Sequence, residues 1–464
     1  MKSISKVILF IVAIFSTLVA FSMDQWRSVQ NAETLSVYLN NKPAGEMRTS
    51  LTVKGSSVIV ESMLKSEVSG GGSVPIVAVI EEKREYDSLG NFVKASQEMS
   101  SPAGKNLWSL DKSSNGQWLL KVTTGGVENS RVLKSVNDRI VNTYLMYQGI
   151  KKATIKPGLV WNDTIIELTS GEPVNVQVRC VEVPVAKNGN VWTFTERNSI
   201  NEKDEKWVVD REGKTVYREV FPFVAKRKNA SVQDTGMVNI FETFMVPQSR
   251  VVADNENVVI AGDENFNIDK SVISFYRKTG SKYQFKGTSG ECTQGKVFTV
   301  PDSLSCYLSA TPTMQVNNPD IKKLAGQFAQ RSPGCERIKA MNDYVFATLK
   351  KEYTATFSSA LETYKAGFGD CGEHAVLLAA LLRASGIPAR VVFGMVYMPQ
   401  QKGYFYHAWV LAFDGNKWIF SDPAFGVFPA NKDRLPLLID DSGEKMISLA
   451  RVIGRLKIDY ITNK

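Results

Sequence analysis

The residues best suited to chemistry lie in the heptapeptide Gly369–Ala375, Gly-Asp-Cys-Gly-Glu-His-Ala, which opens a long apolar segment. The chain contains only two histidines, His374 and His407, and both follow Cys371 within 36 positions. A thiol at the start of a helix, a histidine and a downstream carboxylate are the components of a cysteine nucleophile site. The pattern indicates the chemistry and leaves the substrate open.

The segment that follows Asp370 is expected to form a buried helix that presents the thiol. Asp370 can cap the helix, and Glu373 completes a capping box. Cys371 then lies in the first turn, where the helix dipole favours a negative charge by about 0.3–1 kcal/mol and the backbone N–H can bind an oxyanion. From Ala375 to Leu382 the segment is apolar on nearly every face, which is typical of a buried helix. An inert, buried cysteine is the alternative, and the small neighbours of Cys371 favour an accessible thiol.

Either histidine could be the base that activates this thiol. His374 lies one helical turn after Cys371, inside the predicted buried helix, so we expect a packed and hydrogen-bonded side chain. His407 lies in a predicted strand at 404–413, where its side chain is free to approach a substrate. We therefore expect His407 to be the base.

A hairpin after His407 supplies the third residue. An Asp414-Gly415 loop of type I′ would place His407 directly opposite Asp422, and this is the expected register. A Gly415-Asn416 loop would instead make His407 and Asp422 diagonal neighbours on the same face. Facing side chains in a hairpin are close enough for a hydrogen bond, so Asp422 is expected to orient the imidazole.

Taken together, these segments resemble the transglutaminase-like superfamily of papain-related cysteine enzymes. The matching stretches are Gly369–Ala375, Arg383–Arg390, His407–Trp409 and Asp422–Pro423. The resemblance implies that Cys371 is the nucleophile, His407 the base and Asp422 the residue that orients it. It also implies a second oxyanion donor from an upstream segment, for which Tyr353 is the candidate.

The resemblance leaves the reaction open, because activities in this superfamily include peptide hydrolysis and acyl transfer from glutamine side chains. The expected function is hydrolysis of peptide or amide bonds through a cysteine thioester. The alternatives are a protein-glutamine acyltransferase (a transglutaminase) and a non-catalytic envelope binding protein. No cofactor and no metal are expected, since the chain shows no acidic calcium loop and Cys371 with His374 supplies too few ligands for zinc.

The first 22 residues have the features of an export signal. Lys2 and Lys6 precede an apolar run at 7–21, and Ala20–Ser22 offers a small-x-small cleavage site. An uncleaved membrane anchor is the alternative. We therefore expect a periplasmic or extracellular protein whose partner is a peptide or protein substrate in the cell envelope, with no membrane contact beyond the signal segment.

The remaining chain is expected to be of the α+β class, with a mainly-β N-terminal region of antiparallel sheets followed by a transglutaminase-like, papain-like α+β domain. The predicted divisions are a β-rich region at 23–250, a small β domain or linker at 251–312 and the catalytic domain at 313–464. One helix is predicted at about 133–148. The motif Asp-x-x-Gly-x-x-Val occurs at Asp87 and again at Asp210, which indicates either two similar sheet units or one hairpin turn used twice.

Five cysteines are present in a chain that is expected to be exported. If Cys371 is the reactive thiol, Cys292 and Cys306 are the preferred disulfide, because they flank a predicted strand at 296–300. Cys180 and Cys335 would then either form a second disulfide or stay as buried thiols.

The charge pattern argues against a nucleic-acid partner. The formal net charge is +9, and it falls to +7 (9 − 2) when the two leader lysines are removed. Lysine and arginine are scattered among acidic residues without a dense basic run, which is typical of a solvated surface. No feature of the sequence fixes an oligomeric state.

Overall fold

The structure is a computed structural model that describes residues 23–462 except for 70–74, 102–103, 186–189, 201–202, 221, 228–243, 263–265, 288–290, 293–297, 353–357, 432, 444, 446–448, 450–451 and 453. The predicted export signal lies outside the described residues. Within them, no helix is both long and apolar enough to cross a membrane.

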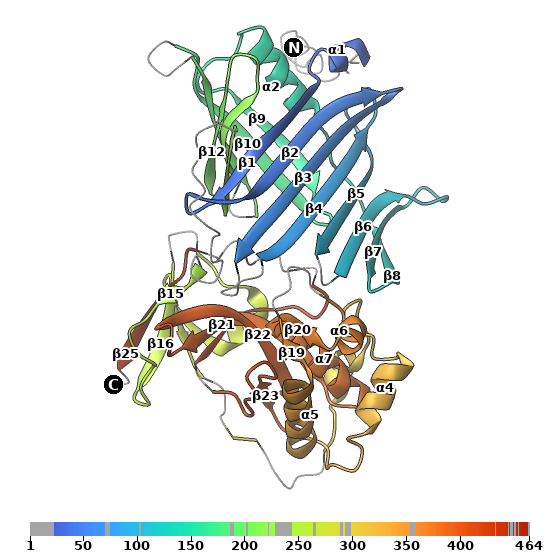
Figure 1. The fold of residues 1–464 in the computed structure, drawn as a ribbon, viewed down its shortest axis with the longest axis vertical. Helices are drawn as coiled ribbons and strands as arrows, with labels where there is room; N and C mark the ends of the chain where they lie inside the picture. Colours follow the sequence, from blue (N-terminus) through green and yellow to red (C-terminus); the bar gives the residue numbers. More distant parts are fainter. Residues whose placement is uncertain are drawn as a thin grey trace, which may run out of the picture.

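The N-terminal half is one continuous antiparallel sheet of fourteen strands (Figure 1). The strands are β1 (Asn31–Leu39), β2 (Lys42–Lys54), β3 (Ser57–Ser69), β4 (Pro75–Tyr86), β5 (Phe92–Ser101), β6 (Gly104–Lys112), β7 (Trp118–Thr124), β8 (Val127–Leu133), β9 (Val160–Ile166), β10 (Pro173–Glu182), β11 (Trp192–Asn198), β12 (Asp204–Val209), β13 (Thr215–Val220) and β14 (Phe223–Arg227). Two meanders, β1–β8 and β9–β14, join where β1 pairs with β14.

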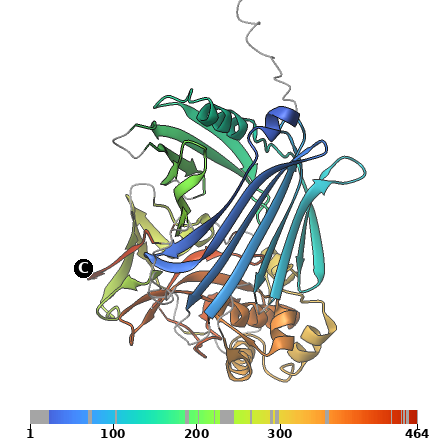
Figure 2. The ribbon, with the colours of Figure 1, turned by 45° about the horizontal axis from the view of Figure 1, so that its top comes forward.

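The sheet curls until its two ends share a core (Figure 2). Leu110 of β6 and Leu120 of β7 are fully buried in the same cluster as Ile166 of β9. Arg84 of β4 also reaches across the interior and donates to the Ile166 carbonyl at 2.8 Å and to the Asp138 carboxylate at 2.5 Å. The result is a barrel-like body whose interior is closed by side chains, although the order of strands has two free ends, β8 and β9.

Two helices pack against this sheet at the end remote from the C-terminal half (Figure 1). They are α1 (Met23–Arg27) and α2 (Val141–Lys151). Trp26 of α1 is completely buried in the core under β3–β7, and Met146 and Ile150 of α2 are buried against β10–β12. The helix predicted at about 133–148 is therefore present but begins later, because β8 extends through Leu133.

The repeated Asp-x-x-Gly motif is one hairpin turn used twice in a single sheet. The Asp87 carboxylate, between β4 and β5, accepts hydrogen bonds from the amides two and four positions later, and the Asp210 carboxylate does the same between β12 and β13, all at 2.8–3.0 Å. Gly90 and Gly213 take φ values of +75° and +83°, a conformation that glycine adopts without steric cost.

The C-terminal half contains helices packed on a short antiparallel sheet (Figure 1). Its elements are β15 (Val246–Pro247), β16 (Glu256–Ala261), the 3₁₀ helices η2 (Lys270–Phe275) and η3 (Asp302–Leu308), β17 (Tyr276–Thr279), β18 (Lys282–Phe285), α4 (Pro319–Gly326), α5 (Cys335–Thr348), β19 (Lys350–Lys351), α6 (Ala360–Ala366), β20 (Phe368–Gly369), α7 (Cys371–Ala384), β21 (Ala389–Met398), β22 (Gly403–Phe413), β23 (Trp418–Ser421), β24 (Arg434–Ile439) and β25 (Lys457–Thr462). The main sheet runs β15-β22-β21-β24, and β23 pairs with the other end of β22.

The small β segment after residue 250 shares its core with this half. Its sheet, β17-β18-β16-β25, takes its last strand from the C-terminal end of the chain. Val258 and Ile260 of β16 belong to the same buried cluster as Leu377 of α7. The prediction of a mainly-β region followed by an α+β domain is confirmed, whereas α6, β24 and β25 were not predicted.

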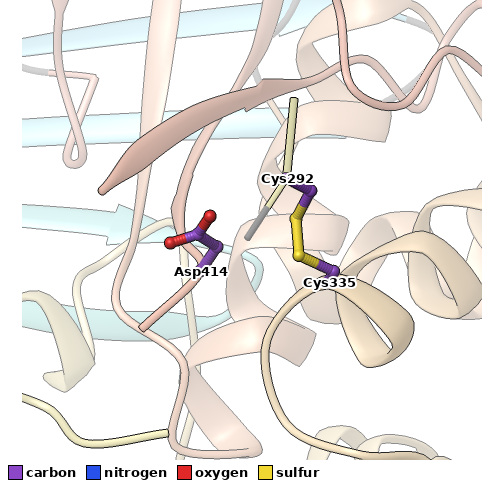
Figure 3. A group of neighbouring side chains, drawn as sticks. All are labelled: Cys292, Cys335 and Asp414. Atoms are coloured by element: carbon purple, nitrogen blue, oxygen red, sulfur yellow. A yellow bond between two sulfur atoms is a disulfide. The ribbon is translucent and has the colours of Figure 1, made fainter. Parts of the chain in front are cut away.

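The predicted disulfide is wrong. Cys292 is bonded to Cys335 at the start of α5 (Figure 3). Cys306 is an exposed free thiol. Cys180 is a buried free thiol. The bond joins positions 43 residues apart, so it depends on how the chain folds back onto α5, which the local pattern around Cys292 does not show. Of the strand predicted at 296–300, residues 296–297 lie outside the described residues, and residues 298–300 do not form a strand.

Asp414 lies beside this disulfide, and the three side chains form the close group in Figure 3. Its carboxylate accepts hydrogen bonds from the amides of Asn416 and Lys417 at 2.8 and 2.9 Å. The sulfur–sulfur bond engages both cysteines, so they do not offer thiolate ligands. The disulfide thus cross-links the start of α5 to the segment at Cys292, close to the β22–β23 turn.

Removal of the Cys292–Cys335 disulfide is expected to destabilise the C-terminal half. A Cys292→Ser/Cys335→Ser variant should lose about 2–4 kcal/mol of unfolding free energy, because the cross-link restricts the unfolded chain. Urea unfolding at pH 7 measures the change, with Cys306→Ser as the matched control. An unchanged transition midpoint in the double variant would contradict the expectation.

Candidate active site

Cys371 is the first residue of α7, as predicted. The Asp370 carboxylate accepts a hydrogen bond from the Gly372 amide at 2.8 Å, and Glu373 accepts one from the Asp370 amide at 3.0 Å. This is the expected capping box. The other carboxylate oxygen of Glu373 accepts a hydrogen bond from the Ser358 amide at 2.9 Å, which ties the start of α7 to the segment before α6.

The rest of α7 is buried and holds the thiol in a fixed position. Every residue from Gly372 to Arg383 is buried, whereas the Cys371 side chain is partly exposed. The helix packs on β21 and β22 and is surrounded by α4, α5 and α6. A helix held on all sides fixes the position of the sulfur, and positional precision of this kind contributes strongly to the rates of reactions between bound groups.

His407 and Asp422 lie together across the hairpin, in the second of the two predicted registers. Strands β22 and β23 pair Val410 with Ser421, which makes His407 and Asp422 diagonal neighbours. The imidazole Nε2 lies 2.9 Å from Asp422 Oδ2. Both side chains are buried, with 7% and 0% of their surface exposed.

The register that we expected is wrong because of the turn. The Asp414 amide donates to the Lys417 carbonyl at 3.0 Å, so the loop is Gly415-Asn416. Only Gly415 takes a positive φ, +100°. That is the requirement of a turn with glycine in the first central position, whereas a type I′ turn needs a positive φ at both central residues.

Asp422 is held as a carboxylate by Arg434, His407 and two backbone amides. Arg434 of β24 donates through Nε to Asp422 Oδ2 at 2.7 Å, and His407 bonds to the same oxygen. The amides of Ala424 and Phe425 donate to Oδ1 at 3.1 and 3.2 Å. Burial alone would raise the pKa of Asp422, but His407 and Arg434 outweigh it and lower that pKa to about 2.

Strand β22 also packs against α7, near Cys371. The backbone N–H of Ala408, the residue after His407, is hydrogen-bonded to Cys371. Because Nε2 of His407 is engaged by Asp422, Nδ1 is the nitrogen left for the thiol proton. The structure therefore brings His407 and Asp422 into contact and places their strand, β22, against the helix that begins at Cys371.

The thiol is expected to be neutral at rest. Burial raises the pKa of Cys371 well above its ordinary value, the Asp370 carboxyl adds to this rise, and the Ala408 amide opposes it. Burial and the neighbouring Glu373 carboxyl likewise raise the pKa of Asp370 well above its ordinary value. The arrangement is therefore suited to proton transfer from sulfur to imidazole during attack, rather than to a stable thiolate.

These residues lie within a recognisable family segment. Residues 322–423 match the family model described as the transglutaminase-like superfamily, and this segment contains Cys371, His407 and Asp422. The chain carries a transglutaminase-like domain. No curated protein matches the sequence.

Solved structures similar to parts of the chain are distant. A candidate cysteine protease from Cytophaga hutchinsonii is 16% identical over 47% of this chain and 83% of its own, with a TM-score of 0.31. A β-barrel-like protein of unknown function from Brucella abortus is 11% identical over 42% of this chain and 94% of its own, with a TM-score of 0.32. A family protein of unknown function from Pseudomonas aeruginosa is 14% identical over 37% of this chain and 89% of its own, with a TM-score of 0.22.

His374, the histidine not assigned to the proposed chemistry, is packed as predicted. His374 is completely buried, and its Nδ1 lies 2.6 Å from the Asp370 carbonyl oxygen. This contact requires a proton on Nδ1. Burial lowers the pKa of His374, so the ring is neutral near pH 7. Tyr353, the candidate oxyanion donor, lies outside the described residues and stays a prediction.

Arg434 is the site residue that the sequence did not reveal. It lies in the first position of β24, where a charged residue precedes an apolar run, and its side chain is almost fully buried. The one local signal was this charge beside the run Leu435–Ile439. Its contact with Asp422 depends on the pairing of β24 with β21, which brings it to the transglutaminase-like segment from outside.

Loss of Arg434 is expected to weaken the transglutaminase-like domain most at neutral pH, where Asp422 is ionised. An Arg434→Met variant leaves Asp422 buried with one cationic partner fewer, so unfolding free energy should fall by about 3 kcal/mol or more. The Asp422 contribution to stability is present above the unfolded pKa of about 3.9 and is lost as pH falls towards the folded value of about 2. In the variant that folded pKa is higher, so the Asp422 contribution at pH 7 is smaller and the difference in stability between the two proteins narrows as pH falls towards 3.

Urea unfolding of both proteins from pH 7 to pH 3 measures this difference. The matched control is Arg390→Met, which removes a half-buried arginine that pairs with Asp441 at 3.0 Å, away from Asp422. Equal pH dependence in the Arg434 and Arg390 variants would contradict the role given to Arg434.

A hollow also lies on the barrel-like sheet, far in sequence from these residues. A groove of about 660 Å³ crosses the face of β1–β6 and is lined by Arg48, Glu61, Glu81, Lys83, Glu98 and others. These side chains alternate along the strands with those buried in the core, so the groove lies on the outer face. Several of its charges are paired, as Lys83 is with Glu61 at 3.2 Å. It contains none of the predicted catalytic residues.

Proposed function

We propose that the protein is an exported cysteine enzyme that hydrolyses peptide or amide bonds through a thioester at Cys371. The observation that carries the proposal is the buried contact between His407 Nε2 and Asp422 at 2.9 Å. The residue after His407, Ala408, donates a backbone hydrogen bond to the Cys371 thiol. The transglutaminase-like match supports the same class of chemistry.

The proposed reaction begins when the Cys371 thiol gives its proton to His407 Nδ1 and the sulfur attacks the substrate carbonyl carbon. The resulting oxyanion accepts a hydrogen bond from the Cys371 amide at the start of α7. Asp422 holds the imidazole ring and stabilises its positive charge. The protonated imidazole then gives its proton to the leaving amine as the carbon–nitrogen bond breaks, which leaves a thioester.

Hydrolysis completes the cycle. His407 takes a proton from water, the hydroxide attacks the thioester carbon, and the carbon–sulfur bond breaks to release a carboxylic acid. The thiolate recovers its proton from the imidazole. A primary amine in place of water would give a new amide, which is the transglutaminase reaction and the second candidate that the family match favours.

An assay with glutamine-containing peptides distinguishes the candidates. The peptides are incubated with and without a primary amine, and the products are identified by mass spectrometry. A hydrolase gives cleaved or deamidated peptide in both samples, whereas a transglutaminase gives the amine adduct. A non-catalytic binding protein gives none of these products, and the Cys371→Ala variant provides the blank.

Export is also part of the proposal. It is supported by the leader features at residues 1–22 and by the Cys292–Cys335 disulfide, since disulfides persist mainly in oxidising compartments outside the cytoplasm. N-terminal sequencing of the protein recovered from a cell-envelope fraction tests cleavage near Ser22. Recovery of the intact leader on a soluble cytoplasmic protein would contradict export.

A further inference from the structure

A lysine and two phenylalanines form an exposed cluster close to the proposed catalytic residues. The Lys351 ammonium lies 4.8 Å from the ring centre of Phe346 and 5.5 Å from that of Phe425. Phe346 is 41% exposed and Phe425 36% exposed. Large exposed aromatic side chains are uncommon as a group and are typical of binding surfaces.

The cluster is attached to both sides of the site. Lys351 in β19 pairs with Gly369 in β20, two residues before Cys371. On the other side, the Phe425 ring stacks on the His407 imidazole with ring centres 4.7 Å apart, and the Phe425 amide donates to Asp422. The backbone therefore holds Lys351 beside the start of α7, and its ammonium contacts the same Phe425 ring on which the imidazole stacks.

The charge of Lys351 is not neutralised by the part of the chain that the structure describes. Its neighbour Lys350 forms an ion pair with Glu352, whereas no carboxylate among the described residues pairs with Lys351. The buried carboxylates nearby already have partners: Glu373 binds backbone amides, and Asp422 binds His407 and Arg434. An exposed ammonium group over aromatic rings, with no carboxylate partner among the described residues, is suited to bind an anion from outside.

We propose that Lys351 binds a carboxylate of the substrate on the leaving-group side of the scissile amide, over an apolar floor made by Phe346 and Phe425. The leaving-group side follows from the proposed function, on which this inference rests, because His407 hands its proton to the leaving amine and Phe425 covers that imidazole. The substrate class is then a peptide with an acidic group just beyond the scissile bond. The carboxylate is either a side chain or the free end of the peptide.

Three peptides of one sequence test the preference. The first carries glutamate after the scissile bond and an amidated end, the second carries glutamine there with a free terminal carboxylate, and the third carries glutamine and an amidated end. Binding to the Cys371→Ala variant is measured by fluorescence anisotropy, and kcat/KM is measured with the active enzyme. One of the two acidic peptides should bind about tenfold more tightly than the neutral one, at low salt, and the one that does identifies the source of the carboxylate.

Substitution of Lys351 separates recognition from structure. Lys351→Met keeps an unbranched side chain over the two rings and should abolish the preference, mainly through KM. Lys350→Met, the adjacent lysine with its own acidic partner, should leave the preference unchanged. Lys351→Glu should reverse it towards a peptide with lysine at the same position, and added salt should weaken the original preference because exposed charges are screened.

The binding measurement with the Cys371→Ala variant tests this inference separately from the proposed function. If an acidic peptide binds tightly through Lys351 but no peptide is turned over, the recognition role stands and the proposed hydrolysis is wrong. If the acidic peptides bind no better than the neutral one, or if Lys350→Met has the same effect as Lys351→Met, the role of Lys351 is overturned.

Discussion

Replacement of Cys371 by alanine is expected to abolish turnover while the protein stays folded. The substitution removes only the sulfur at a partly exposed position in the first turn of α7, so the capping box at Asp370 and Glu373 is retained. Loss of a nucleophile that works together with a base typically lowers kcat by about 10⁴–10⁶-fold. Peptide hydrolysis and the urea unfolding midpoint are measured on the same preparation.

Cys306→Ala is the matched control for this change. Cys306 is also a free thiol, and it is exposed. It lies in η3 and has no place in the proposed chemistry, so its replacement should leave kcat/KM unchanged. Turnover that survives in Cys371→Ala at more than a hundredth of the original rate, in a folded protein, would contradict the assignment of the nucleophile.

Replacement of Asp422 by asparagine is expected to lower kcat by about 10³–10⁴-fold. A neutral amide cannot stabilise the imidazolium, and it can present an N–H to His407 that favours the wrong tautomer. The change also leaves Arg434 with a weaker partner in a buried position, so a loss of stability should accompany the loss of rate. The rate is therefore measured under conditions where circular dichroism shows the variant to be folded.

Asp414→Asn in the same hairpin distinguishes the two effects. Asp414 is buried as well, and its carboxylate caps the β22–β23 turn through two backbone amides. Its replacement should reduce stability by about 1–2 kcal/mol and alter kcat by less than about tenfold. If the two variants lose activity in parallel with stability, Asp422 is a structural residue of the hairpin and has no role in orienting His407.

The residues proposed for catalysis could be found from the sequence because their signals are local. Asp370 and Glu373 mark the start of the helix that presents Cys371. His407 and Asp422 are only 15 positions apart in the sequence, so they fall within one hairpin. Two alternative loops were compatible with Asp414-Gly415-Asn416, and both kept the side chains on one face. The error in the turn therefore did not separate the pair.

Features that depend on distant pairing could not be found in this way. Arg434 reaches Asp422 only because β24 pairs with β21, and Cys335 reaches Cys292 across 43 positions. The sheet of β16–β18 is completed by β25 from the end of the chain. In each case the partner is chosen by how strands and helices assemble, and the local pattern of either segment is compatible with several partners.

The N-terminal half shows the same limit. The sequence predicted a β-rich region of antiparallel sheets and a turn motif repeated at Asp87 and Asp210. They did not predict that β1 pairs with β14 to make one sheet of two meanders. A turn motif determines the register of its own hairpin, whereas the closure of a sheet is determined by side chains such as Leu120 and Ile166 that meet only after folding.

Acylation of Cys371 by an activated ester is the most direct test of the proposed chemistry, because it needs no knowledge of the substrate. The protein is treated with p-nitrophenyl acetate, and acetylation of Cys371 and of the exposed Cys306 is measured by mass spectrometry over time, in the original protein and in His407→Gln. Base-assisted attack predicts that Cys371 is acetylated at least about 100-fold faster than Cys306 and that the difference disappears in His407→Gln. Equal rates at the two thiols, or a fast Cys371 that is unaffected by the loss of His407, would contradict a nucleophile activated by that histidine.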